Sequence, residues 1–190
     1  MDIAILQWIH VNLHGIVWLN YAFKYITLLG EKALFSIILC VLLIIIKKTR
    51  KCGLACAIGL ALNILIVNVI LKNIVGRERP WTEYAELESY FDQYNILLPD
   101  DSSFPSGHTA AIFCTATILT LFYKAKVGVP AYIIAVLVAL SRIWLCVHYP
   151  TDVLAGAVIG SACAAAGYFI FKFIDRKLAN RKKSKGKQDS

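Results

Sequence analysis

Charged residues are scarce in this sequence: they make up 17% of its 190 residues, against about 25% in an average soluble domain. Hydrophobic residues make up 58%, and the mean hydropathy is +0.64. A soluble domain of this length does not need so much apolar surface. The composition therefore argues against an ordinary soluble domain and indicates one integral membrane domain.

Several other features are missing. The N-terminus has neither a basic stretch nor a small-residue cleavage site, so we expect no cleavable signal peptide. Cys52 and Cys56 have no histidine or second cysteine pair nearby, and most cysteines fall within apolar runs, which predicts buried free thiols rather than metal ligands or disulfides. The carboxylates of residues 76–104 match no metal-loop spacing, so we expect no metal and no other cofactor.

The apolar runs predict an all-α polytopic membrane protein with six spanning helices, after a short interfacial helix over residues 1–13. The predicted spans are residues 15–29, 33–46, 53–71, 105–123, 130–147 and 152–171, with a short basic turn over 124–129. Between the third and fourth lies an extracytoplasmic loop, residues 76–104, which is rich in carboxylates and aromatic rings and should hold a short helix. Residues 1–175 form one membrane-embedded domain, and residues 176–190 form a basic, disordered cytoplasmic tail.

Two details of the predicted spans bear on packing. Lys24 lies within the first span and must either reach the interface or face the bundle interior. Gly156, Gly160 and Ala164 recur every four residues in the sixth span, which allows another helix to approach closely. We favour packing within the bundle over dimerisation.

The net charge of +8 is concentrated in clusters at residues 47–51, 124–126 and 176–187. With six spans these clusters share one side, which the positive-inside rule assigns to the cytoplasm, together with both termini. The loop 76–104 and the turn 148–151 then face outward. Basic residues beside spanning helices suit anionic lipid, so we expect the bilayer as partner, with no nucleic acid and no obligate protein partner.

Two polar runs on that outer side could hold an anion. Lys72 and Arg79 are about two helical turns apart, and Pro80 should leave Arg79 just beyond the helix end. The run Pro105-Ser106-Gly107-His108 begins the fourth span, where free backbone N–H groups and the positive end of the helix dipole favour an anion.

The third polar run lies between the last two spans and supplies Arg142, His148 and Asp152. Charges so close to hydrocarbon are expensive, and a functional role is their default interpretation. If Pro150 begins the next helix, Asp152 lies in its first turn and can face His148. A carboxylate on one ring nitrogen leaves the other free to attack or to take a proton. Together with the cations, this arrangement suits a phosphate group.

These runs resemble the three-part signature of the type-2 phosphatidic acid phosphatase family, which shares a superfamily with the vanadium haloperoxidases. Every signature position is matched in order: Lys72-x6-Arg79-Pro80, then Pro105-Ser106-Gly107-His108, then Ser141-Arg142-x5-His148-x3-Asp152. The small size and short loops are similar to bacterial membrane lipid phosphatases. The resemblance implies a metal-independent lipid phosphatase or diphosphatase of the cell membrane.

The resemblance also implies residue roles. His148 would be the nucleophile that becomes phosphohistidine, Asp152 would orient it, and His108 would be the general acid. The phosphoryl oxygens would be held by Lys72, Arg79, Arg142, Ser106 and the Gly107 amide. Ser141 receives no firm role. Because His148 must be neutral and His108 charged, we expect a bell-shaped pH–rate profile.

The substrate stays open at this point. Undecaprenyl diphosphate is favoured by analogy, and phosphatidylglycerol phosphate and phosphatidic acid are alternatives. A lipid phosphotransferase of the same fold would carry the same motifs. A six-span anion transporter lined by Lys72 and Arg142 and a non-catalytic lipid-binding protein are hypotheses from other classes, whereas a haloperoxidase would be soluble.

Overall fold

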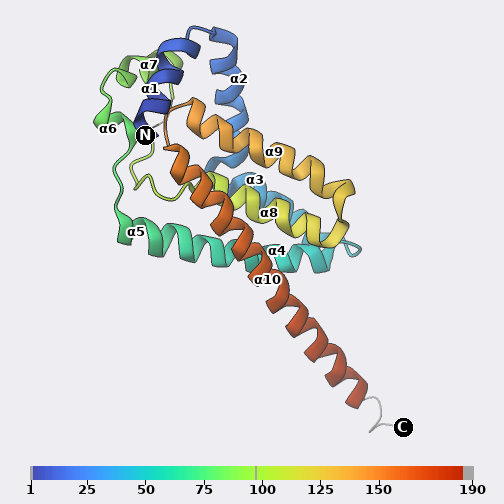
Figure 1. Ribbon diagram of the computed structural model, residues 1–190. Helices are drawn as coiled ribbons and strands as arrows, with labels where there is room; N and C mark the ends of the chain where they lie inside the picture. The colour runs from blue at the N-terminus through green and yellow to red at the C-terminus, as the bar shows by residue number, and fades with distance from the viewer. Residues whose placement is uncertain (1, 97, 186–190) are drawn as a thin grey trace.

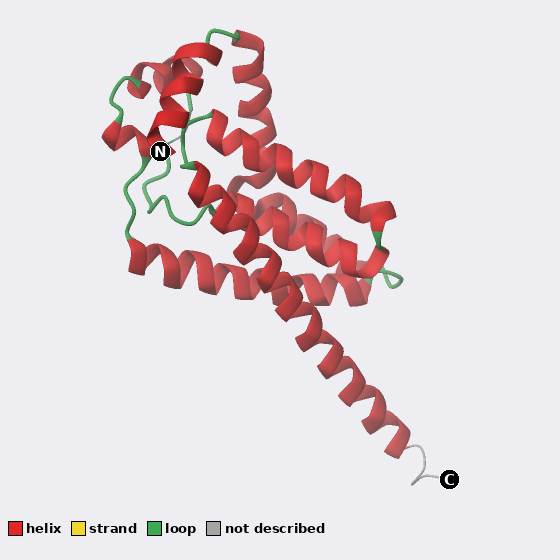
Figure 2. Ribbon diagram, viewed as in Figure 1, coloured by secondary structure: helices red, strands yellow, loops and turns green. Residues whose placement is uncertain are grey.

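The computed structural model describes residues 2–96 and 98–185, and within these residues it contains helices and no strands (Figure 1, Figure 2). The all-α prediction is confirmed for this part of the chain. The helices are α1 (Asp2–Leu13), α2 (Val17–Thr27), the 3₁₀ helix η1 (Leu28–Ala33), α3 (Leu34–Ile45), α4 (Arg50–Asn63), the π-helical η2 (Ile64–Leu71), α5 (Lys72–Val75), α6 (Pro80–Glu83), α7 (Leu87–Tyr94), α8 (Gly107–Tyr123), α9 (Ala125–Trp144) and α10 (Pro150–Lys185).

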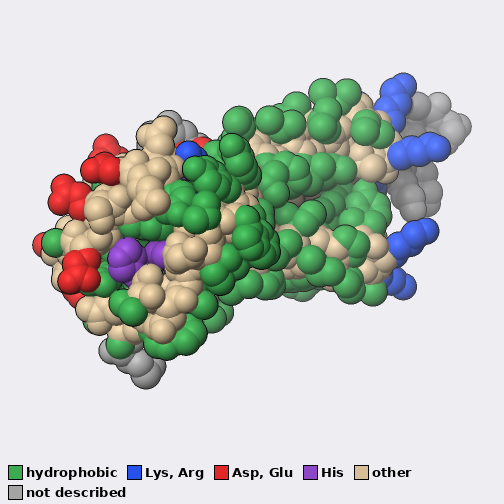
Figure 3. All heavy atoms as spheres, turned by 90° about the horizontal axis from the view of Figure 1, so that it is seen from above, with side chains coloured by type: hydrophobic (Ala, Val, Ile, Leu, Met, Phe, Trp, Pro, Cys, Tyr) green, Lys and Arg blue, Asp and Glu red, His purple; other side chains and the backbone are tan. Residues whose placement is uncertain are grey.

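Three helical segments of the described chain are long and apolar enough to cross a membrane: Arg50–Glu83, Ala125–Trp144 and Pro150–Arg181. The pair Val17–Glu31 and Leu34–Ile45 passes the same test as one span bent by 49°, and α8 is a shorter apolar helix. Hydrophobic side chains cover the middle of the molecule, with Lys and Arg at one end and Asp and Glu at the other (Figure 3). The protein is therefore a helical membrane protein.

Contacts place α1, α2 and η1 at the acidic end of the molecule. Asp2 accepts a hydrogen bond from Thr151 Oγ1 at 2.5 Å, immediately before the buried part of α10. Further along, His14 contacts the Trp144 carbonyl at 2.7 Å and Lys24 donates to the Tyr94 carbonyl at 2.8 Å. Lys24 thus faces the protein interior, one of its two expected positions.

This placement bears on the predicted topology. The sequence predicts that residues 15–29 cross the membrane and that both termini share one side. In the structure α2 stays beside the acidic end, whereas α10 runs away from it toward the C-terminus (Figure 1). The partners of α2 hold it there: Lys24 donates to the Tyr94 carbonyl at 2.8 Å, and Trp144 Nε1 donates to Asn20 Oδ1 at 2.9 Å.

Two further boundaries differ from the sequence prediction. The turn between the fourth and fifth predicted spans is shorter than residues 124–129, because Lys124 reverses the chain with φ +57° and α9 begins at Ala125. Pro130 therefore lies inside α9, where it removes one backbone donor. The tail predicted to be disordered from residue 176 is helical through Lys185, because Leu, Ala, Arg and Lys are strong helix formers and no breaker interrupts them. Residues 186–190 lie outside the described residues.

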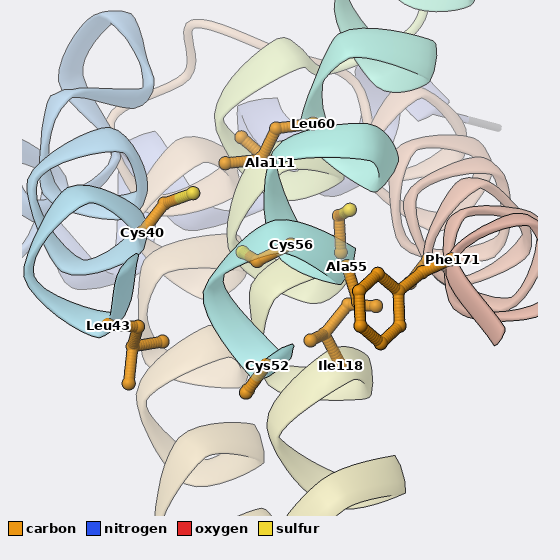
Figure 4. Packing of buried hydrophobic residues seen from close by; sticks show 11 residues of the cluster. Cys40, Leu43, Cys52, Ala55, Cys56, Leu60, Ala111, Ile118 and Phe171 are labelled. Atoms are coloured by element: carbon orange, nitrogen blue, oxygen red, sulfur yellow. The ribbon is translucent and has the colours of Figure 1, made fainter. Parts of the chain in front are cut away.

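Helix α8 lies at the centre of the bundle and packs on α4, α9 and α10, while α3 packs on α4 (Figure 1). The core between α3, α4, α8 and α10 contains Cys40, Cys52, Cys56 and Cys114 among small and aliphatic side chains (Figure 4). All six cysteines are free and buried, which confirms the prediction of packed thiols. A thiol behaves there as a small hydrophobic group.

The small residues of α10 bring it close to α8. A Cβ on Gly156 would lie 2.6 Å from the Ser106 carbonyl oxygen, and one on Gly160 would lie 2.1 Å from the Ala110 carbonyl oxygen. Both contacts are within the chain, so the prediction of packing inside the bundle is confirmed. This close approach also sets the start of α8 against the start of α10, where the Ser106 amide donates to the Asp152 carbonyl at 3.0 Å.

Gly160→Ala should destabilise the fold, because the new methyl group would overlap backbone that cannot move without separating α8 from α10. Overpacking of this kind costs about 1–3 kcal/mol or more. The thermal unfolding midpoint in detergent should fall clearly. Gly15→Ala is the matched control, since a Cβ there meets nothing within 4 Å. An unchanged midpoint for Gly160→Ala would contradict the close approach of these two helices.

Candidate active site

The three predicted motifs meet at the acidic end, around a cavity of about 730 Å³. Its lining includes six of the eight predicted site residues: Lys72, Arg79, Gly107, His108, Arg142 and His148. Asp152 lies behind His148 and Ser106 lies behind Gly107, so both support the cavity wall rather than form it.

His148 is held in a tight turn between α9 and α10. Cys146 adopts φ +51°, and the Val147 amide donates back to the Arg142 carbonyl at 3.2 Å. Pro150 then begins α10, as the sequence predicts, and the Asp152 amide donates to the Tyr149 carbonyl at 3.0 Å. The turn leaves the imidazole 2% exposed, with its reachable edge on the cavity.

The partners of the imidazole define its tautomer. Nδ1 lies 3.6 Å from Asp152 Oδ2, while Arg79 Nη1 lies 3.2 Å from Nε2. A guanidinium can only donate, so Nε2 carries the lone pair and Nδ1 carries the proton facing the carboxylate. Nε2 is therefore the atom that can attack a group bound in the cavity.

The surroundings of His148 disfavour protonation of its Nε2 lone pair. Burial, followed by the positive charges of Arg142 and Arg79, lowers the pKa of His148 below its ordinary value, although Asp152 opposes the shift. Desolvation penalises the imidazolium, and the neighbouring cations repel it. The neutral imidazole required of a nucleophile is thus the form that this turn favours.

Two cations of the first motif converge on one carboxylate. The Asp101 side chain accepts hydrogen bonds from Lys72 Nζ and Arg79 Nη2, and its backbone carbonyl accepts from Arg79 Nε at 2.8 Å. Burial alone would raise the pKa of Asp101, but the hydrogen bonds and charges of Lys72 and Arg79 outweigh it and hold the pKa below its usual range. An anion therefore already lies where two of the expected phosphate ligands meet.

Arg142 supplies a third cation from the last turn of α9. It is 4% exposed, and its Nη1 donates to Thr27 Oγ1 at 2.5 Å. Its Nε is buried and has no hydrogen-bond partner among the described residues, although Arg142 lines the cavity. A buried guanidinium donor without a partner is costly, and an oxyanion bound in the cavity would satisfy it.

The second motif forms the start of α8. Ser106 is the N-cap, and its Oγ accepts from Thr109 Oγ1 at 3.0 Å, so the hydroxyl is used within the helix rather than turned toward the cavity. Gly107 packs close to the preceding helix, because a Cβ there would lie 3.3 Å from Asn68 Oδ1 and 4.0 Å from Lys72 Nζ. His108 Nε2 lies 3.3 Å from Glu31 Oε2 of η1, within reach of a hydrogen bond from a ring N–H to that carboxylate.

The remaining signature residue, Ser141, forms a hydrogen bond within α9. Ser141 Oγ donates to the Val138 carbonyl at 2.6 Å, one turn earlier in α9. It is fully buried next to Arg142 in the sequence, and its hydroxyl is satisfied within α9. In the described part of the chain no three His, Cys, Asp or Glu side chains are grouped closely enough to bind a metal ion.

The geometry fits a membrane-bound enzyme that acts on phosphate groups. Residues 52–176 match the family described as the PAP2 superfamily. The undecaprenyl-diphosphatase of Sulfolobus acidocaldarius is 31% identical over 154 residues, which are 80% of this chain and 70% of that protein. Phosphatidylglycerophosphatase B of Bacillus subtilis is 31% identical over 176 residues, which are 85% of this chain and 77% of that protein.

A solved structure agrees with these sequence matches. The crystal structure of a transmembrane PAP2-type phosphatidylglycerolphosphate phosphatase from Bacillus subtilis matches with a TM-score of 0.69 and 29% identity, over 93% of this chain and 85% of that chain. The chain belongs to the PAP2 superfamily, and it is a membrane lipid phosphatase. The family resemblance predicted from the three motifs is confirmed.

Proposed function

We propose that the protein hydrolyses the phosphate monoester or diphosphate head group of a membrane lipid through a phosphohistidine on His148. The observation that carries this proposal is that His148 lines one cavity together with Lys72, Arg79 and Arg142, with its Nε2 lying 3.2 Å from Arg79 Nη1. Undecaprenyl diphosphate is the favoured substrate, and its hydrolysis is the activity named for the Sulfolobus acidocaldarius relative.

The reaction would take two steps. In the first, Nε2 attacks phosphorus and the bond to the leaving oxygen breaks, while His108 gives that oxygen a proton. In the second, water attacks the phosphohistidine, His108 takes a proton from the water, and inorganic phosphate leaves. The three cations hold the phosphoryl oxygens in both steps and stabilise their charge in the transition states.

The cavity wall supports a lipid substrate. Beyond the polar groups it is lined by Leu28, Ile37 and Ile64, which are themselves exposed on the outer surface of the helices. The polar end of the cavity is therefore continuous with an apolar surface between η1, α3 and η2. A lipid can place its phosphate near His148 while its chain stays in hydrocarbon.

Phosphate release tests this function. The purified protein in detergent with EDTA should release inorganic phosphate from at least one of undecaprenyl diphosphate, phosphatidylglycerol phosphate and phosphatidic acid, without an acceptor lipid. The three rates rank the substrates. Transfer of phosphate that requires an acceptor lipid would instead establish a phosphotransferase, and absence of any turnover would favour a transporter.

The pH dependence of kcat/KM should be bell-shaped. Since the pKa of His148 is lowered, its neutral form persists below the ordinary histidine value of about 6.5. The acidic limb should therefore have its midpoint below that pH, and the alkaline limb should appear where His108 loses its proton. A rate that rises monotonically to strongly alkaline pH would contradict these two roles.

We infer further that the chain crosses the membrane five times, through α3, the continuous α4–η2–α5, α8, α9 and α10, with the active site and α1 outside. The six predicted crossings reduce to five because α2 stays at the outer end. The basic clusters at 47–51 and 124–126 and the C-terminal part of α10 then still lie together on the cytoplasmic side. Loop 76–104 lies outside, as the sequence predicts.

Labelling of cells tests this topology. Gln7→Cys, on the exposed surface of α1, should react with a membrane-impermeant maleimide in intact cells. Lys126→Cys, exposed near the start of α9, should react after the cells are permeabilised. The native cysteines are buried and give a low background. Protection of the thiol introduced by Gln7→Cys in intact cells would restore the six-span prediction.

A further inference from the structure

Arg77 lies between the two cations of the first motif but does not line the cavity. Its side chain is 31% exposed and forms an ion pair with Asp152, whose side chain is fully buried. Nη1 donates to Asp152 Oδ1 at 2.7 Å and to Thr151 Oγ1 at 2.8 Å, and Nη2 donates to Asp2 Oδ2 at 3.0 Å. The guanidinium also covers the Tyr149 ring, 3.8 Å from its centroid.

The two oxygens of the Asp152 carboxylate have different hydrogen-bond partners. Oδ2 accepts from Ser103 Oγ at 2.5 Å and from the Tyr149 amide at 3.0 Å, and it faces His148 Nδ1. Within the described residues, Oδ1 accepts its hydrogen bond from Arg77. Arg77 therefore fixes the rotation of the carboxylate, and with it the direction in which Oδ2 meets the imidazole.

We propose that Arg77 is a positioning residue of the phosphatase reaction, which holds Asp152 so that His148 keeps its Nε2 lone pair directed into the cavity. This inference rests on the proposed function of His148. Asp2 and Tyr149 restrain the guanidinium in turn, so the start of α1 forms the outermost part of the same network. A supporting residue of this kind acts on the chemistry through the residue that it orients.

The position of Arg77 predicts its kinetic signature. The ligands of the phosphate, such as Arg79, contact the cavity, and their loss should affect substrate binding as well as turnover. Arg77 touches neither the cavity nor the expected phosphate position. Its loss should therefore lower kcat and leave KM nearly unchanged, since the interaction matters for the transition state rather than for binding.

Arg77→Ala should lower kcat about 10–100-fold, as supporting residues commonly do, while KM changes less than about twofold. Arg77→Lys keeps the positive charge but lacks the paired N–H donors of the guanidinium, so it should recover part of the lost kcat. Arg50→Ala is the matched control, because Arg50 bonds the Ile44 carbonyl at the far end of the bundle. A raised KM with unchanged kcat in Arg77→Ala would make Arg77 a substrate ligand and overturn the inference.

A double-mutant cycle tests whether Arg77 affects kcat through Asp152. In the Asp152→Asn background, Arg77→Ala should reduce the residual rate by less than about twofold, because the carboxylate through which Arg77 acts is gone. The residual rate is measured with enzyme in excess over lipid. If the rate loss of the double variant equals the product of the two single losses, Arg77 does not act through Asp152.

A third readout does not depend on turnover. The pKa of His148 can be followed by ¹⁵N NMR of the histidine-labelled protein, with the His148→Ala protein assigning the signal. Removing the cation beside Asp152 leaves more negative charge facing the ring, so the pKa of His148 should rise in Arg77→Ala. An unchanged pKa together with unchanged kcat would refute the inference, whereas an inactive wild-type protein would refute the proposed function instead.

Discussion

Replacing His148 by alanine should lower phosphate release by about 10⁴-fold or more, the scale seen when a covalent nucleophile is removed. His108 and His148 both line the cavity, but His108 Nε2 lies 3.3 Å from the Glu31 carboxylate, whereas His148 Nε2 lies 3.2 Å from Arg79 Nη1. The protein should still fold, because the turn around His148 is closed by backbone hydrogen bonds. The assay is release of inorganic phosphate from the preferred lipid.

The matched control for this change is His10→Ala. His10 lies in the aromatic cluster of α1, with its ring centroid 5.5 Å from that of Tyr84, and it does not line the cavity. Its variant should keep most of the wild-type rate. If His148→Ala retained more than about a tenth of that rate, a nucleophilic role for His148 would be untenable, since nucleophile removal has far larger effects.

Asp152→Asn should have the second-largest effect, a loss of about 10⁴-fold in kcat by analogy with other carboxylate–histidine pairs. The amide has nearly the same shape, but it can present a donor to His148 Nδ1 and so favour the tautomer with the proton on Nε2. Oδ2 also accepts from Ser103 and from the Tyr149 amide, so the substitution disturbs an otherwise satisfied site.

Asp175→Asn is the matched control for that substitution. Asp175 pairs with Lys51 at 2.7 Å near the basic end of α10, far from the cavity, and its variant should behave as wild type. A mild effect of Asp152→Asn on kcat would separate Asp152 from the chemistry. It would also favour the hypothesis of an anion transporter, in which the carboxylate has no tautomer to control.

Local sequence rules predicted the backbone positions of two of the candidate site residues. Local rules placed Arg79 beyond a helix end before Pro80 and placed Asp152 in the first turn of α10, and both positions are observed. The four-residue spacing of small residues gave the α8–α10 contact. Such features depend on neighbours within one or two turns, which is the range over which sequence patterns are informative.

The position of α2 beside the acidic end, on which the proposed five-span topology rests, could not be predicted from the charge pattern. Every basic cluster lies after α3, so removing one crossing before it moves the N-terminus and leaves all clusters on one side. The positive-inside test was therefore insensitive to α2. What fixes α2 is a set of long-range hydrogen bonds, from His14 to Trp144 and from Lys24 to Tyr94, which no local pattern encodes.

Long-range partners also account for the site residues that sequence reasoning missed. Glu31 meets His108 and Thr27 meets Arg142 because η1 folds against the start of α8 and the end of α9. The sequence places Asp101 among the carboxylates of an acidic loop, and its closeness in sequence to His108 is the signal that points to the site. Ser106 is the converse case. The sequence predicts that it binds phosphate, whereas its hydroxyl accepts a hydrogen bond from Thr109 as the N-cap of α8. A role for it in binding stays a prediction.

The most direct test is to trap the covalent intermediate. The protein is mixed with the phosphorylated lipid that it hydrolyses fastest and quenched in alkali within one turnover, since phosphohistidine is labile in acid. It is then digested and examined by mass spectrometry. We predict a phosphoryl group on the peptide that contains His148, absent from the Asp152→Asn protein quenched at the same time. Rapid phosphate release with no phosphohistidine on His148, or with the group on His108, would contradict the account.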